Sequence, residues 1–141
     1  MPRKSDPFSI RLSPGTDELI SREARRTRRS KGAVVEALAE EALRTRRFPG
    51  IAFRGSDWDR RPWVMGTAMD VWEIVWASRS FSSPGEMAGH YEIGEAQVRL
   101  ALAYYREYPD AIDERIRDSE RSLEELQREH PSIDTIAVDI D

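Results

Sequence analysis

Two polar side chains near the amino terminus have a spacing that suits contact with nucleic-acid bases. Ser9 and Arg11 alternate with Phe8, Ile10 and Leu12, and strict alternation is the period of a strand with one apolar face. A guanidinium group can make a bidentate hydrogen bond to guanine, and a hydroxyl can bond to any base. We therefore predict that Ser9 and Arg11 read the bases of double-stranded DNA.

A second polar group lies where a new helix is expected to begin. Ser30 is a suitable N-cap, and Lys31 follows it directly. Because the amides at a helix start bind phosphate, we predict phosphate contacts for Ser30, Lys31, Arg28 and Arg29. The cations of the preceding helix either contact phosphate without reading sequence or form a solvated surface: Arg22, Arg25 and Arg26.

One strand and two helices would position these residues. The strand covers residues 8–12, and Ser13 and Pro14 then supply an N-cap and a first helical residue. The segment 28–30 separates the first helix from a second one, which ends before Phe48, Pro49 and Gly50. The second helix shows apolar residues at spacings of three and four: Val34, Val35, Leu38, Ala42 and Leu43.

A lone strand of this kind cannot satisfy its backbone groups or bury its apolar face. No second strand is expected in the first forty or so residues, so the strand needs a partner chain. Antiparallel pairing across a two-fold axis would produce a dimer with Ser9 and Arg11 of both chains on one ribbon. Such a ribbon fits the major groove.

The segment FSIRLSPGTDELISREARRTRRSKGAVVEALAEEAL resembles the ribbon-helix-helix family of the Arc and CopG type. The resemblance implies that residues 1–47 form a dimeric DNA-binding domain whose strand reads bases and whose second helix begins at a phosphate. Two features depart from the family pattern. Arg28 stands where the turn often has glycine, and Gly32 is a poor helix former inside the second helix.

The following segment predicts a small hairpin and three helices. Residues 51–54 and 61–65 read as strands around the turn at 55–59. A helix over 69–79 carries Trp72 and Trp76, which we expect in the core, the alternative being an exposed aromatic interface.

A capping box at 83–86 starts a short helix that runs to about Tyr91. A longer helix runs from Glu95 to Pro109. The two give a helix-turn-helix outline, but the longer helix offers few cations beyond Arg99 and Arg106, so we do not expect it to read DNA.

Residues 48–117 resemble the antitoxin domain of the VapB type, a hairpin plus three helices. The resemblance implies a type II toxin-antitoxin system in which the domain accompanies and neutralises a toxin with a PIN-like ribonuclease fold, without catalysis. The residues that carry it are Pro49-Gly50-Ile51, Gly66-Thr67, Asp70-Val71-Trp72, the helix from Glu86 to Tyr91, Val98-Arg99-Ala101-Leu102-Tyr104-Tyr105 and Pro109-Asp110-Ile112.

The remaining residues form a tail, 118–141. Asp110 can cap a last helix that runs to His130 with a thin apolar stripe; the helix is either a solvated extension or a segment that docks in a partner's groove. The final residues alternate like a strand, which adds to a partner's sheet, pairs within the dimer or stays disordered. The candidate toxin contacts are Leu123, Leu126, Ile136, Val138 and Ile140.

Composition argues against an enzyme. The chain has no cysteine, its two histidines, His90 and His130, lack metal-ligand spacing, and it has no phosphate-binding glycine loop or nucleophile motif. The tail carboxylates share one exposed helix, whereas catalytic acids converge from separate elements. We expect no catalysis, cofactor or metal.

Charge is divided between the two halves. Residues 1–48 hold 12 Lys and Arg against 7 Asp and Glu, and the rest hold 10 against 19, so the net charges are +5 and −9. A basic end suits nucleic acid, and an acidic end suits another partner. No stretch is long and apolar enough for a membrane span or a signal peptide, so we expect a cytoplasmic protein without membrane contact.

The sequence therefore predicts a mostly α protein: a ribbon-helix-helix domain, a hairpin plus helical domain and a helical tail. Its predicted role is an antitoxin that binds operator DNA as a homodimer or higher even oligomer, represses its own operon and neutralises a PIN-like toxin. The alternative is a standalone regulator whose second domain senses a ligand or oligomerises. A single-stranded RNA binder is disfavoured because the tyrosines and tryptophans lie on apolar helix faces.

Overall fold

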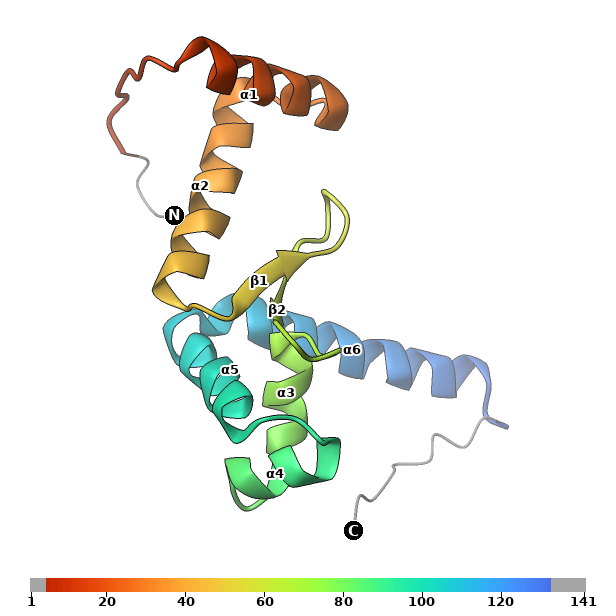
Figure 1. The fold of residues 1–141 in the computed structure, drawn as a ribbon. Coiled ribbons are helices and arrows are strands. Elements are labelled where there is room, and N and C mark those ends of the chain that lie inside the picture. Colours follow the sequence, from red (N-terminus) through yellow and green to blue (C-terminus); the bar gives the residue numbers. More distant parts are fainter. Residues whose placement is uncertain (1–4, 133–141) are drawn as a thin grey trace. The chain divides into compact units, whose positions relative to one another are not determined.

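The computed structural model of the chain describes residues 5–132 and is mostly helical, with one two-stranded sheet among those residues (Figure 1). The chain forms two compact units, Met1–Ala42 and Leu43–Asp141. The functional domain limits expected after residues 47 and 117 stay predictions.

In the first unit, helix α1 (Pro14–Thr27) begins as predicted. The Oγ of Ser13 accepts a hydrogen bond from the amide of Thr16 at 3.4 Å, and proline follows the cap. Helix α2 (Lys31–Arg47) begins at Ser30, whose Oγ accepts from the amide of Ala33 at 3.1 Å. Both N-caps inferred from sequence are thus confirmed.

The turn between these helices is a Schellman motif. The amide of Arg28 donates to the carbonyl of Arg25 at 3.4 Å, and the amide of Arg29 donates to the carbonyl of Ala24 at 3.0 Å. Arg28 has φ of 54°, in the left-handed region. This is the conformation that favours glycine at the end of a helix, so Arg28 fills the position at some conformational cost.

The strand predicted for residues 8–12 is not formed in the single chain. Residues 5–12 lie in neither a helix nor a strand. In the described part of the chain the one sheet consists of two strands of the second unit, which pair with each other. A strand is defined by its pairing, so the ribbon across a dimer axis stays a prediction.

The second unit opens with the predicted hairpin. Strand β1 (Ile51–Arg54) pairs antiparallel with β2 (Arg61–Val64), so that Ile51 faces Val64 and Arg54 faces Arg61. Gly55 begins the turn with φ of 109°, and a Cβ there would lie 2.2 Å from the carbonyl oxygen of Asp59. Only glycine fits this turn.

Four helices complete the unit: α3 (Val71–Ser78), α4 (Pro84–Tyr91), α5 (Glu95–Glu107) and α6 (Pro109–Glu129). All four agree with the sequence reading, with two local corrections. Tyr108, not Asp110, is the N-cap of α6, because Pro109 already takes the first helical position. Glu86 bonds to the amide and hydroxyl of Ser82 instead of closing the capping box on Ser83.

Helices α3, α5 and α6 enclose the core, with α4 against α5 and the hairpin beside α3 (Figure 1). The core is formed by apolar side chains that are almost completely buried, including Ile51, Val64, Ile74, Met87, Val98, Tyr104, Ile112 and Ile116. The expectation that both α3 tryptophans are core residues is half wrong. Trp72 is half-buried against the core, whereas Trp76 is 46% exposed, because the buried side of α3 is set by Ile74 and Val75.

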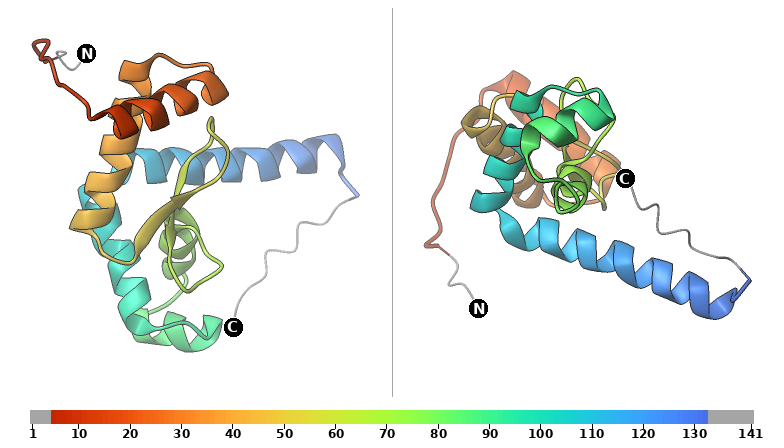
Figure 2. Two further views of the ribbon diagram at one scale, coloured as in Figure 1. Left: turned by 45° about the horizontal axis from the view of Figure 1, so that its top comes forward. Right: turned by 90° about the horizontal axis from the view of Figure 1, so that it is seen from below.

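Helix α6 is only partly packed. Ile112 and Ile116 are buried in its first half, whereas residues 120–130 are exposed. In Figure 2 the second half of α6 extends beyond the other helices of its unit. The helix continues without a break through residue 117.

Candidate functional site

The predicted base-reading residues lie in the irregular segment before α1. Ser9 and Arg11 are exposed, but Phe8 and Ile10 on the expected opposite face are exposed as well, at 82% and 53%. The single chain therefore does not distinguish the two faces of the segment.

The predicted phosphate contacts lie together at the turn between α1 and α2. The Ser30 hydroxyl is already used as the cap of α2. The Lys31 ammonium lies 2.5 Å from a carboxylate oxygen of Asp17 on α1. A phosphate bound here would have to compete with Asp17 for Lys31, a relationship that the sequence did not reveal.

Two of the other α1 cations have acidic partners. Arg22 pairs with Glu18 at 3.2 Å, and Arg26 pairs with Glu23, in each case within the helix. These pairs are exposed and contribute little to stability. They favour the solvated-surface reading for Arg22 and Arg26.

The second unit contains a network of alternating positive and negative side chains. The sequence did not predict it. Asp70, at the N-cap of α3, accepts from Nε of Arg54 and Nε of Arg61, each at 2.7 Å. Arg61 also donates to Asp59 at 2.8 Å, and Asp59 pairs with Arg115 of α6. The network thus links the hairpin to α3 and α6.

The network shifts the pKa of two of its members, Asp59 and Arg61. The hydrogen bond from Arg115, with a smaller contribution from Arg61, lowers the pKa of the Asp59 carboxyl. Hydrogen bonds to Asp70 and then to Asp59 raise the pKa of Arg61. Asp59 and Arg61 therefore both stay charged near neutral pH.

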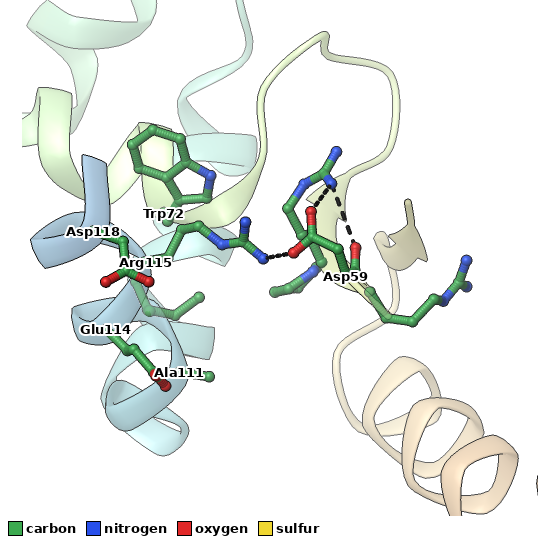
Figure 3. A pocket seen from close by; sticks show the side chains of 10 residues that line it. Asp59, Trp72, Ala111, Glu114, Arg115 and Asp118 are labelled. Atoms are coloured by element: carbon green, nitrogen blue, oxygen red, sulfur yellow. Dashed lines mark hydrogen bonds and ion pairs between the residues drawn. The ribbon is translucent and has the colours of Figure 1, made fainter. Parts of the chain in front are cut away.

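A pocket with a volume of about 280 Å³ adjoins this network. Figure 3 shows the Arg115 side chain extending from α6 past Trp72 to Asp59, with Glu114 and Asp118 on the same helix. The pocket is lined by the hairpin residues Asp59, Arg60, Arg61 and Pro62, by Trp72 of α3, and by the α6 residues Ala111, Ile112, Glu114, Arg115 and Asp118.

Of the predicted toxin contacts, Leu123 and Leu126 lie on the projecting half of α6, where they are 46% and 40% exposed. Both continue the apolar stripe of Ile112 and Ile116. Ile136, Val138 and Ile140 lie outside the described residues.

Within residues 5–132, no group of three or more histidine, aspartate or glutamate side chains could hold a metal ion. None of the helices in the same range combines the length and apolar character that crossing a bilayer requires.

No protein-family model matches the chain, and comparison with curated proteins and with solved structures finds no match.

Proposed function

We propose that this chain is a dimeric, DNA-binding antitoxin that represses its own operon and neutralises a PIN-like ribonuclease toxin. The observation that carries the dimer is the burial in the first unit. Among its described residues only Ala24, Thr27 and Val34 are buried. Four large apolar side chains of the unit are exposed, at 82%, 53%, 66% and 46%: Phe8, Ile10, Leu19 and Leu38.

A core of three small or medium side chains cannot hold a unit of this size by itself. A second copy would cover the exposed residues, and it would supply the partner strand that residues 8–12 need. Substituting Leu38 with Glu should therefore dissociate the dimer, whereas Leu123→Glu on α6 should leave it intact. Sedimentation velocity over a range of concentrations measures this, and a monomeric wild-type chain would overturn the dimer.

In the paired ribbon, Arg11 and Ser9 would read base edges and the start of α2 would hold a phosphate. The test is fluorescence anisotropy with DNA from upstream of the gene. Arg11→Ala should abolish the preference for this DNA over a scrambled duplex while the dimer persists. An unchanged preference would rule out the ribbon as the reading surface.

The antitoxin role rests on the resemblance of residues 48–117 and on the projecting half of α6. An exposed helix with Leu123 and Leu126 on one side suits a partner's apolar groove. Co-expression with candidate PIN-like toxins tests this role, because a stable complex lost in a Leu123→Glu, Leu126→Glu variant would support it. Failure to form any complex would favour the second candidate.

The second candidate is a standalone regulator whose second unit senses a ligand. The pocket between the hairpin and α6 favours it. DNA binding by the first unit is common to both candidates, so the two differ only in what the second unit binds.

A further inference from the structure

The pocket between the hairpin, α3 and α6 has a volume of about 280 Å³, near the lower end of the range for small-molecule sites, so it suits a small ligand or a side chain of a partner. Its apolar surface comes from Trp72, Pro62 and Ile112, the last being 2% exposed. The rest of the lining is charged. Whether the pocket suits an anion or a cation depends on which of its charged side chains lack a partner of opposite charge.

Every arginine of the lining already has acceptors. Arg61 donates to both Asp70 and Asp59, and Arg115 donates to Asp59. Arg60 donates to the carbonyl oxygens of Gly55 and Phe53, at 3.0 and 3.1 Å. An anion entering the pocket would have to displace these acceptors, so the lining does not favour an anion.

The carboxylates on the α6 wall are less compensated. Glu114 has no hydrogen-bond or ion-pair partner among the described residues. Asp118 has a single weak pair within the described part of the chain, with Arg121 at 3.4 Å, and both side chains are more than half exposed. The lining therefore retains negative charge on its α6 side, beside the ring of Trp72.

The Arg115 side chain extends past Trp72 and its guanidinium pairs with Asp59 of the hairpin, which leaves Glu114 and Asp118 available to another cation (Figure 3). Two carboxylates beside an aromatic ring suit a planar cation. A planar guanidinium can pair with carboxylates through two parallel hydrogen bonds and can also stack on an aromatic face, whereas an ammonium is a compact, strongly hydrated charge.

We propose that this pocket binds a guanidinium group, held by Glu114 and Asp118 beside Trp72. The group belongs either to a small molecule or to an arginine of a partner protein, and the binding chemistry is the same. Glu125 and Glu129 follow Asp118 on the same side of α6. They give an arginine-containing basic peptide additional contacts that a small molecule lacks. This site does not depend on DNA binding by the first unit. It gives the second unit a ligand of its own, a guanidinium group.

The test uses the full-length chain labelled with 5-fluorotryptophan, whose four fluorine signals are assigned with Trp→Phe variants. Titration with N-acetylarginine amide should shift the Trp72 signal saturably and leave Trp63 and Trp76 unchanged. N-acetylcitrulline amide, which has nearly the same shape but no charge, should produce no shift. Equal responses to both compounds, or no response of Trp72, would overturn the proposal.

Variants locate the site. Glu114→Gln and Asp118→Asn should each weaken binding by about threefold to fivefold, as expected for one partly exposed ion pair. Glu124→Gln, which removes a charge from another side of α6, should leave the affinity unchanged. Equal losses in all three variants would reduce the effect to general attraction by an acidic helix and would overturn the site.

A second arm separates the two sources of the guanidinium group. The probe is a peptide with one arginine followed by two lysines at four-residue spacing. Tighter binding than that of the amide, lost in Glu125→Gln, Glu129→Gln, assigns the site to a partner protein. Equal affinities assign it to a small molecule, and failure of the peptide to shift Trp72 contradicts a pocket open to guanidinium groups.

Discussion

Arg61 donates a 2.7 Å hydrogen bond from Nε to the carboxylate of Asp70, which is only 4% exposed. Directly across the hairpin from Arg61 lies Arg54, and it bonds to the other oxygen of the same carboxylate. Two like charges facing each other across a strand pair repel. Asp70 neutralises this repulsion and fixes the start of α3 against the hairpin.

Removal of this carboxylate should destabilise the second unit. Asp70→Ala leaves two half-buried guanidinium groups facing each other, which should cost about 3 kcal/mol of unfolding free energy. Urea unfolding followed by tryptophan fluorescence measures the loss. Asp110→Ala, an exposed position in the first turn of α6, is the control and should cost about 0.5 kcal/mol or less. Equal losses in the two variants would contradict a structural role for the network.

Arg28 and Glu92 end α1 and α4 in the left-handed region, both with φ of 54°. Replacing either residue with glycine should raise the unfolding free energy by about 0.5–1 kcal/mol, because glycine adopts this conformation without strain. Thermal unfolding checks the gain. Arg28→Gly should also weaken DNA binding, since it removes a predicted phosphate contact, whereas Glu92→Gly should not. A stability loss in both variants would show that other contacts of these side chains outweigh the strain.

The local elements of the fold could be predicted from sequence because their causes lie within a few residues. Ser13 with Pro14, and Ser83 with Pro84, mark helix starts that the structure confirms. Trp76 could not be placed, because spacing alone does not tell which side of α3 its neighbours cover. The strand at 8–12 depends on another chain, so its pairing is not tested by a single chain.

The charge network was missed for a related reason. Its members are far apart in sequence, and Asp59 and Arg115 come together only when α6 packs beside the hairpin. One signal was present. The hairpin register puts Arg54 opposite Arg61, and such a pair requires an acid nearby, which Asp70 supplies.

Tyr105 should contribute stability that is lost at alkaline pH. Its hydroxyl donates to Asp113 at 2.6 Å, and this hydrogen bond, together with burial, raises the pKa of the phenol. A raised folded-state pKa stabilises the neutral form, so the contribution is fully present below the unfolded value of about 10 and disappears as pH rises through the folded value.

Tyr105→Phe should therefore lower the unfolding free energy by about 1 kcal/mol near pH 7, and the difference from wild type should shrink above about pH 10. Urea unfolding at both pH values measures it. Tyr91→Phe, at another half-buried tyrosine, is the control for loss of a hydroxyl group. A pH-independent difference for Tyr105→Phe would argue against the bond to Asp113.

Lys31 should make a phosphate contact that Asp17 weakens. In the free chain the two side chains form an ion pair at 2.5 Å, so DNA binding must exchange one anion for another at Lys31. Lys31→Gln should weaken binding to specific and scrambled DNA alike and reduce the slope of log affinity against log salt by about one. Asp17→Asn should have the opposite effect on affinity, because Lys31 then meets phosphate without competition. Fluorescence anisotropy at several salt concentrations measures both, with Glu36→Gln on α2 as a control for general charge. A slope unchanged in Lys31→Gln would exclude the start of α2 as the phosphate site.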